Sequence, residues 1–404
     1  MSTSLLYHGF GIRGYQYVKT EYIGGKVIFT VCQEVDSLRC PVCGSRHVIR
    51  RGSCHRLFLS LPIGSHPVRT SLDIPRVGCL DCGAVRQVRV GFADERRSYT
   101  RSFERYVLEL SKHMTIQGVA RHLQVGWDTV KDIQKRSLSR RFRRIRVKGL
   151  RQIAIDEISI GRGHRYLTVV LDLLSGAVVF VGDGKGADAL SPFWERLKRS
   201  RAKIEAVAID MSPAYISAVL KNLPKAVLVF DHFHIIKLYN EKLSALRRDL
   251  YREATEKLHK DVLKGTRWLL LKNPENLDDT RNETRRLQEA LKLNEPLATA
   301  YYMKEDLRRV WEQPDKDTAR KILEAWIARA ETSNIRMLHQ FAKTMSMYRN
   351  QILNFYDYRI STGPLEGTNT KIRVLQRQAY GFRDIEFFKL KIYALHETRL
   401  ELVG

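Results

Sequence analysis

The sequence predicts an α/β protein in which a mixed sheet domain is interrupted by an all-helical segment and preceded by two small domains. Over residues 151–235, strand-like apolar runs alternate with runs of helical periodicity. Residues 236–355 are charged, helical in period and poor in strand signals. The region before residue 150 carries two Cys-x-x-Cys motifs and a pair of short helical patterns. A chain of 404 residues is long enough to bury several separate cores.

These changes in composition set the expected domain boundaries. Each boundary falls where the hydrophobic pattern changes its period or its charge. The expected segments are an N-terminal segment (1–35), a zinc-binding domain (36–95), a helix-turn-helix domain with a basic linker (96–150), the first part of the sheet domain (151–235), an all-helical insertion (236–355) and the second part of the sheet domain (356–404).

Four cysteines in residues 36–95 form the strongest metal-binding pattern in the chain. Cys40 and Cys43 make one Cys-x-x-Cys motif, and Cys79 and Cys82 make a second, each followed by Gly. Two such turns complete a tetrahedral site, so we expect structural Zn²⁺ in a zinc ribbon. The residues between the motifs are expected to form a pair of strands. The alternative is a pair of reduced surface turns or a redox motif, which would not require two matched copies.

Residues 115–135 have the layout of a helix-turn-helix. A first helix is expected from Thr115 to Leu123, then a tight turn through Gly126, and a second helix from Trp127. Gln124 occupies the turn position where Gly is customary. The alternative is an ordinary helical hairpin. The residues expected to contact DNA, in the second helix and in the basic linker after it, are Trp127, Asp128, Lys131, Arg140, Arg141, Arg143 and Arg144.

The net charge of the chain predicts a polyanionic partner. There are 70 Lys and Arg residues against 44 Asp and Glu, which gives a formal charge of +26, and double-stranded DNA is the obvious match. A membrane-surface protein would need a basic amphipathic helix beside an apolar anchor. No uninterrupted apolar run approaches about 18 residues, and the N-terminus lacks the pattern of an export signal. We therefore expect a soluble intracellular protein with no membrane partner.

Acidic residues mark the strand-like runs of the sheet domain. Asp156 lies within the first run, while Asp210 and Asp231 close two later ones. Glu366 lies far downstream, in the first turn of a helix that is expected to begin near Pro364. Acids at the carboxyl ends of neighbouring strands meet in the crevice where an α/β sheet binds its ligand. Because buried carboxylates are costly unless a cation meets them, we expect a divalent metal site here.

The succession of runs matches a ribonuclease-H-like sheet. Three antiparallel strands, a helix, and two further strands alternating with helices are expected over residues 151–235. In such a sheet the first and fourth strands are neighbours, which would place Asp156 opposite Asp210. Phosphodiester chemistry uses two ions about 4 Å apart. Asp156 is therefore expected to bridge two Mg²⁺ or Mn²⁺ ions, with Asp210 and Glu366 each holding one. The tryptophans of the insertion are expected to pack in its helical core, with stacking on bases as the alternative: Trp268, Trp311 and Trp326.

Over nearly its whole length, the chain resembles the bacterial insertion-sequence transposases of the ISL3 family, which are DDE enzymes with an N-terminal zinc ribbon. The matching motifs, in the family's order, are CPVCGS, VARHLQVGWDTVK, IAIDE, VAIDMSPAY, FDHFHIIKLYN and GPLEGTNTKIRVLQRQAYGFRD. The resemblance implies that Asp156, Asp210 and Glu366 form the catalytic triad. It also implies binding of terminal inverted repeats, cleavage of the DNA ends, transfer of the 3′ ends into target DNA, and a cytoplasmic, nucleoid-associated location. Asp231 and His234 are similar to an Asp-x-x-His signature of several DDE superfamilies, and we expect them to brace the site.

Two alternatives remain open at this point. One is a DNA-binding regulator with an inactive sheet domain. The absence of one of the predicted catalytic acids would have favoured this alternative, but all of them are present. The other is a structure-selective nuclease, which would cut DNA without joining it. Two N-terminal DNA-reading modules favour recognition of a defined end sequence over recognition of DNA shape. Because synapsis of two DNA ends requires at least two active sites, we expect a homodimer on DNA.

Overall fold

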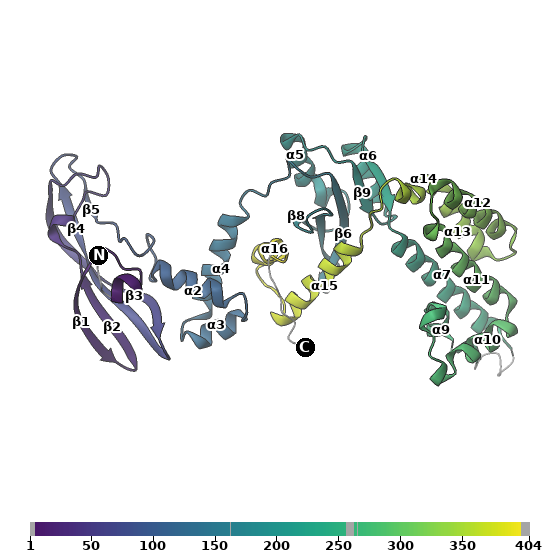
Figure 1. Ribbon diagram of the computed structural model, residues 1–404, viewed down its shortest axis with the longest axis horizontal. Helices are drawn as coiled ribbons and strands as arrows, with labels where there is room; N and C mark the ends of the chain where they lie inside the picture. The colour runs from purple at the N-terminus through teal and green to yellow at the C-terminus, as the bar shows by residue number, and fades with distance from the viewer. Residues whose placement is uncertain (1–4, 162, 256–261, 265, 397–404) are drawn as a thin grey trace. The chain divides into compact units, whose positions relative to one another are not determined.

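The computed structural model describes residues 5–161, 163–255, 262–264 and 266–396. The chain divides into two compact units (Figure 1). The first unit comprises residues 1–143, 378–390 and 397–404, and the second comprises residues 144–377 and 391–396. No helix in the described ranges is long and apolar enough to cross a membrane.

A five-stranded sheet forms most of the first unit. It follows the short helix α1 (Leu5–His8), and its strands run in the order β1-β2-β4-β3, with β5 paired to β4. The long antiparallel hairpin of β3 and β4 is the expected strand pair between the cysteine motifs. Strands β1 and β2 pair into the same sheet, so the segment 1–35 is not separate from the cysteine-bearing strands. The strand bounds are Gln16–Ile23 (β1), Lys26–Cys32 (β2), Val48–Ile63 (β3), His66–Cys79 (β4) and Val85–Gln87 (β5).

A group of helices in the first unit has the predicted helix-turn-helix layout. They are α2 (Arg101–Leu110), α3 (Ile116–His122) and α4 (Trp127–Arg141). Thr100 and Thr115 begin α2 and α3 as N-caps, because their side chains accept hydrogen bonds from backbone N–H groups of the first turn. The three helices share one small core, with these residues fully buried: Val107, Val119, Val130 and Ile133.

A second five-stranded sheet lies at the centre of the second unit, in the order β10-β9-β6-β7-β8. Strands β6, β7 and β8 form an antiparallel meander, and β9 is parallel to both β6 and β10. The first and fourth strands are therefore neighbours, as predicted. All four residues of β9 are fully buried, which is typical of a strand covered on both faces. The strand bounds are Gln152–Gly161 (β6), Arg165–Asp172 (β7), Val178–Asp183 (β8), Ala206–Ile209 (β9) and Val227–Phe230 (β10).

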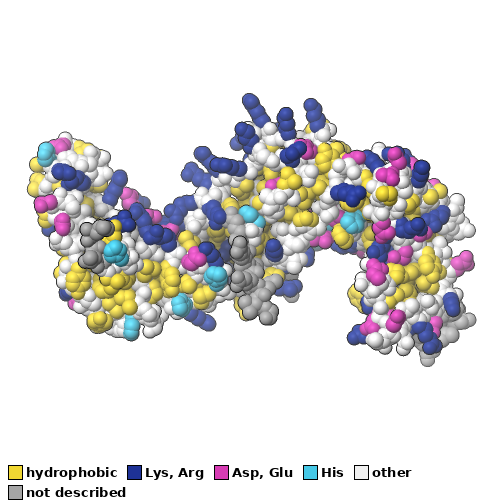
Figure 2. Space-filling view, in the orientation of Figure 1, with side chains coloured by type: hydrophobic (Ala, Val, Ile, Leu, Met, Phe, Trp, Pro, Cys, Tyr) yellow, Lys and Arg dark blue, Asp and Glu magenta, His cyan; other side chains and the backbone are white. Residues whose placement is uncertain are grey.

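Helices α5 (Ser191–Ser200) and α6 (Pro213–Asn222) alternate with these strands, which gives a mixed α/β fold. Helix α5 buries Phe193, Trp194 and Leu197 in the core of the unit. On the face that Figure 2 presents, Lys and Arg side chains gather over α5. Towards the end of the described residues come α15 (Gly363–Gln378) and α16 (Ile385–Tyr393).

The segment between β10 and α15 is helical, as predicted. Its helices are α7 (His232–Glu253), α9 (Arg267–Leu271), α10 (Glu283–Leu293), α11 (Glu295–Arg308), α12 (Lys316–Thr332), α13 (Arg336–Met347) and α14 (Arg349–Leu353). Helix α7 is continuous across the expected boundary at residue 236, so it connects the end of β10 directly to the helical region.

The tryptophans of this region divide into two kinds. Trp326 is fully buried against Tyr239 and Phe341, as predicted for a core residue. Trp311 is half-buried and packs against the same core. The prediction is wrong for Trp268, whose side chain is 66% exposed. It lies in the short helix α9, which buries only Leu269 and Leu270 and leaves its other side open to solvent.

Candidate active site and metal centre

Three aspartates lie level with one another across the second sheet. Ala154 of β6 is in register with Ala208 of β9, so Asp156 and Asp210, each two residues further along, continue the same register on the same face. Phe230 of β10 is in register with Ile209, which puts Asp231 level with Asp210. Asp210 and Asp231 directly follow the carboxyl ends of β9 and β10, and Asp156 lies at the same level within β6, two residues beyond its pairing with β9. The crevice outside the carboxyl ends of such strands is where α/β sheets bind their ligands.

Asp156 is half-buried and held by two hydrogen bonds. Its Oδ1 accepts from the backbone N–H of Glu157 at 2.8 Å, and its Oδ2 accepts from Nδ2 of Asn369 on α15 at 2.8 Å. Burial raises the pKa of Asp156 to about 6 despite the first of these bonds. Asp210 is also half-buried, and its Oδ1 accepts from the backbone N–H of Ser212 at 3.0 Å. Both carboxylates are fixed in orientation before any cation binds.

Asp231 is buried and makes the densest set of hydrogen bonds in the site. Its Oδ2 accepts from Nδ1 of His234 at 3.0 Å and from the hydroxyl of Thr362, and its Oδ1 accepts from the backbone N–H of Phe233 at the start of α7. Burial raises the pKa of Asp231, but the bonds from His234 and Thr362 outweigh it and leave that pKa below its usual value. The pKa of His234 is raised by the same bond. Both shifts favour the charged forms of Asp231 and His234.

Glu366 lies in the first turn of α15 and is exposed. One carboxylate oxygen of Glu366 and one ligand atom each of Asp231 and His234 lie within 4.8 Å of one another. Among the described residues, Asp156 and Asp210 are not part of this cluster at that distance. Asp156 and Asp210 are thus brought to the same level by the register of their strands. Glu366 is close to the side chains of Asp231 and His234.

Asn369 and Thr362 were not predicted from the sequence. Asn369 is three residues after Glu366 on α15, so the two side chains share a helix face. Its Nδ2 holds Asp156, while its Oδ1 is buried without a hydrogen-bond partner in the described part of the chain. Thr362 directly precedes α15 and is fully buried. The i+3 spacing from Glu366 could have identified Asn369, but nothing local in the sequence pairs Thr362 with Asp231.

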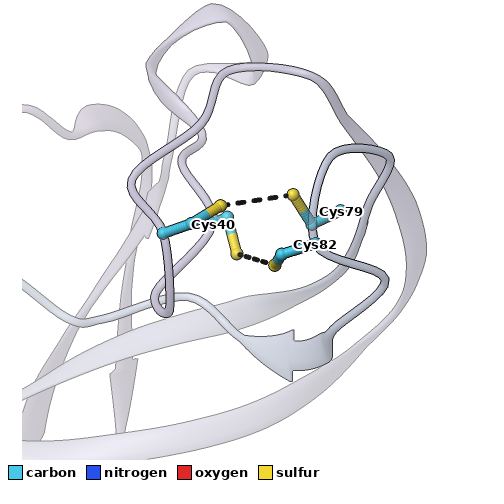
Figure 3. A group of neighbouring side chains, drawn as sticks. Cys40, Cys79 and Cys82 are labelled. Atoms are coloured by element: carbon cyan, nitrogen blue, oxygen red, sulfur yellow. Dashed lines mark hydrogen bonds between the residues drawn. The ribbon is translucent and has the colours of Figure 1, made fainter.

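The four predicted cysteines come together in the first unit. The Sγ atoms of Cys40 and Cys82 are 3.6 Å apart, those of Cys43 and Cys79 are 3.5 Å apart, and all four lie within 4.8 Å of one another. Figure 3 shows the thiols of Cys40, Cys79 and Cys82 directed toward one another. Tetrahedral Zn²⁺ with bonds of about 2.3 Å would place its sulfurs about 3.8 Å apart. The spacing of the thiols is therefore close to that of a zinc site.

The two cysteine turns have the same backbone construction. The N–H of Gly44 donates to the carbonyl of Cys40 at 2.9 Å, and the N–H of Gly83 donates to that of Cys79 at 3.1 Å. Both glycines have positive φ, at 78° and 70°, a conformation that other residues adopt at a cost. This explains why Gly follows each Cys-x-x-Cys motif.

Comparison with known proteins identifies the family. The family model described as "Transposase" for the DDE enzymes of the ISL3 family matches residues 153–392, and the model for the helix-turn-helix domain of transposase family ISL3 matches residues 88–138. The chain belongs to the ISL3 transposase family. It is therefore a DNA transposase, an enzyme that cleaves and transfers DNA, and membership implies catalysis with divalent metal.

Relatives of this transposase cover most of its length. It is 34% identical over 358 residues to the transposase for insertion sequence element IS1001 of Bordetella parapertussis, covering 88% of each chain. It is 32% identical over 370 residues to the transposase for IS1557 of Mycobacterium tuberculosis, covering 85% of this chain and 82% of the relative. A solved structure, the Drosophila P element transposase strand transfer complex, matches with a TM-score of 0.34 and 13% identity over 62% of this chain and 77% of the other.

Several of the residues that were predicted to contact DNA lie on α4. Trp127 is 42% exposed, and Asp128 is exposed beside it. The Nζ atom of Lys131 lies 5.4 Å from the centre of the Trp127 ring and 3.1 Å from Oδ2 of Asp384. Lys135 binds the same carboxylate at 2.7 Å. Burial raises the pKa of Asp384, but the hydrogen bonds from Lys135, the backbone N–H of Phe387 and Lys131 outweigh burial and lower that pKa to about 2.

The basic run after residue 135 is partly helical, which corrects the expectation of a linker. Helix α4 extends to Arg141, so Arg140 and Arg141 lie in its last turn. Nη2 of Arg140 donates to Oε1 of Glu104 on α2 at 2.7 Å, and Arg136 donates to the other oxygen of the same buried carboxylate. This carboxylate would be costly to bury unpaired, which explains why the helix continues into the basic run. Arg143 and Arg144 follow the end of α4 and are exposed.

Proposed function

We propose that this transposase cleaves DNA ends and joins them to target DNA with Mg²⁺ or Mn²⁺ held by Asp156, Asp210 and Glu366 on a ribonuclease-H-like sheet. The observation that carries the proposal is the register of β6 with β9, which makes Asp156, within β6, level with Asp210, the residue that follows β9. Glu366, from the first turn of α15, supplies the third carboxylate beside Asp231.

The donor set suits these ions. Carboxylate oxygens are the ligands that Mg²⁺ and Mn²⁺ prefer, and the buried Oδ1 of Asn369 is a further acceptor beside Asp156. When bound, such ions activate an oxygen nucleophile and stabilise charge on the leaving oxygen. Asn369 orients the Asp156 carboxylate for that purpose. Two carboxylates level on adjacent strands also repel each other, which favours a cation between them.

Asp231 and His234 are proposed as positioning residues. Both Asp231 oxygens are already engaged, by Phe233, His234 and Thr362, and its side chain is buried. The Thr362 bond fixes the residue immediately before α15, and the backbone N–H of Glu366 donates to the Thr362 carbonyl at 2.9 Å. The Asp231–Thr362 contact therefore sets the start of the helix that carries Glu366.

The first unit is proposed to bind the element's ends. The spacing of Cys40, Cys43, Cys79 and Cys82 supports a structural Zn²⁺ in a zinc ribbon that joins the two ends of the β3–β4 hairpin. Helix α4 is proposed to read terminal inverted repeats, with the following residues contacting DNA: Trp127, Asp128, Lys131, Arg140, Arg141, Arg143 and Arg144. Since two ends must be held together, we propose that the active form on DNA is a homodimer.

The test is a cleavage and joining assay on labelled duplex DNA carrying the element's own ends, with wild type beside Asp210→Asn. We expect wild type with Mg²⁺ or Mn²⁺ to cut the ends and join 3′ ends to target DNA, and the variant to bind the same DNA without cutting it. Binding without cutting by both proteins under every metal would favour a DNA-binding regulator. Cutting without joining by wild type would favour a nuclease.

A further inference from the structure

A groove of about 840 Å³ runs along α7 in the second unit. It begins at His232 and Phe233, the first residues of the helix, and extends to Arg248. Arg267 of α9 and Arg308 of α11 line its other side. The groove belongs to the helical region, for which neither the family match nor the catalytic acids assign a role.

Three of the four Lys and Arg side chains that line this groove have no acidic partner among the described residues. Lys237, Arg248 and Arg267 are exposed and make no ion pair with any residue in the described ranges. Arg308 differs, because it bonds to Glu275 and Glu305. The lining includes one acid, Glu241. Three cations without ion pairs, against this one acid, leave the groove with an excess of positive charge that attracts a polyanion.

Exposed aromatic rings accompany these cations. Phe233 lines the groove and is 54% exposed, although it lies between the buried Asp231 and the half-buried His234. Next to Arg267, Trp268 is 66% exposed, and the Arg267 guanidinium carbon lies 4.8 Å from the centre of its ring. Cations interleaved with exposed rings are typical of proteins that bind single-stranded nucleic acid, where phosphates contact the cations and bases stack on the rings.

The groove starts at the active site. Asp231 caps the N-terminus of α7, and Nδ1 of His232 lies 3.6 Å from its Oδ1. Phe233, Lys237, Ser244 and Arg248 follow at helical spacing on one face. From His232 to Arg248 the helix rises about 24 Å, at about 1.5 Å per residue. At the ~3.4 Å per nucleotide of a strand that keeps the stacking of B-form DNA, this length spans about seven nucleotides.

We propose that this groove holds a single DNA strand that continues from the cleavage point, with its phosphates on Lys237, Arg248 and Arg267 and a base stacked on Phe233. The inference rests on the proposed function, because it takes the acids beside His232 to be the place of cleavage. It assigns the helical region a second DNA site, separate from the helix-turn-helix, which binds the strand by its backbone and base faces rather than by sequence.

The test measures how much an unpaired tail adds to DNA binding. The probes are a fluorescein-labelled duplex of the element's end and the same duplex extended, past the cleavage point, by about eight unpaired thymidines, enough to fill the groove at ~3.4 Å per nucleotide. Wild type is compared with Arg248→Glu/Arg267→Glu and with the milder Arg248→Gln/Arg267→Gln. The matched control, Lys321→Glu/Lys343→Glu, makes the same charge change at exposed helical positions outside the groove.

We expect the tail to raise wild-type affinity about tenfold, which is within the range for one stacked base with its phosphate contacts. Both groove variants should lose this gain in affinity, and the gain that remains should depend less on salt concentration than in wild type. The control should keep the full gain. Phe233→Leu should reduce the gain without changing the salt dependence. Three results would overturn the proposal. The tail would give wild type no gain in affinity, or the gain would persist in the groove variants, or the control would lose the gain as completely as the groove variants do.

A further arm separates this inference from the proposed function. Asp210→Asn should keep the gain in affinity that the unpaired tail gives, since the groove does not include Asp210. If wild type fails to cut DNA but the groove-dependent gain is present, the proposed catalysis fails and the strand site stands. If cutting is normal and the gain does not depend on Arg248 and Arg267, the strand site fails alone.

Discussion

Replacing Gln124 by Gly is expected to stabilise the helix-turn-helix. Gln124 has φ of 50°, in the left-handed region. It ends α3 in a Schellman motif, in which the N–H of Val125 donates to the carbonyl of Ala120 at 3.0 Å and the N–H of Gln124 donates to that of Arg121 at 3.2 Å. The position therefore requires the conformation that Gly adopts freely and that Gln adopts at a cost of about 1–2 kcal/mol.

The expected gain is smaller than this cost. Glycine loses about 0.5–1 kcal/mol more backbone entropy on folding than other residues, and Gln124 is exposed, so its removal sacrifices no buried packing. The net stabilisation of the motif is about 0.5–1 kcal/mol, which corresponds to a decrease of roughly two- to fivefold in local opening. Hydrogen exchange of the α3 and α4 amides, followed by mass spectrometry, measures this opening directly.

Gln124→Ala is the control for this substitution, because alanine removes the long side chain but keeps the Cβ that is crowded at positive φ. We expect exchange in α3 and α4 to slow in Gln124→Gly and to stay at or above the wild-type rate in Gln124→Ala. Equal exchange in Gln124→Gly and wild type, or slowing in both variants, would refute the assignment of strain to this residue.

Three further predictions concern the other sites. Cys43→Ser should lower the bound zinc from one equivalent to a small fraction, measured by metal analysis of purified protein, whereas Cys54→Ser should leave it unchanged. Asn369→Leu should reduce the cleavage rate about 10- to 100-fold, the range for residues that orient metal ligands, while DNA binding measured by gel shift stays constant; an undiminished rate would exclude the orienting role. Asp384→Asn should lower the free energy of unfolding at pH 4 to 7. The ionised Asp384 stabilises wild type above its unfolded pKa of about 3.9, and this contribution is lost as the pH falls through its folded pKa of about 2. Unfolding curves of the variant that coincide with those of wild type from pH 7 to 4 would contradict this.

The sequence predicted the features that depend on local spacing. The Cys-x-x-Cys motifs, the helix starts at Thr115 and Trp127 and the strand-end acids follow from residues close together in the chain, and the strand order followed from the succession of elements. The physical reason is that hydrophobic period and turn residues are local signals.

Pairing between distant side chains could not be predicted in this way. Arg136 and Arg140 bond to Glu104, which lies 32 and 36 residues before them in the chain. The sequence alone therefore showed only a uniform basic run. The hydroxyl of Thr362 meets Asp231 across 131 residues. Periodicity indicates that such residues face a core, but it does not indicate which partner each one meets there.

The most direct test of the proposed active site is metal selectivity after Asp210→Cys. A thiolate is a poor ligand for Mg²⁺ and a better one for softer metals, including Mn²⁺. We expect the variant to bind the element's ends normally, to be nearly inactive with Mg²⁺, and to recover cleavage with Mn²⁺. The ratio of its cleavage rate with Mn²⁺ to that with Mg²⁺ should exceed the wild-type ratio by about tenfold or more, which is the size of the loss caused by a perturbed metal ligand. A variant that cleaves with Mg²⁺ as fast as wild type would show that Asp210 holds no catalytic metal.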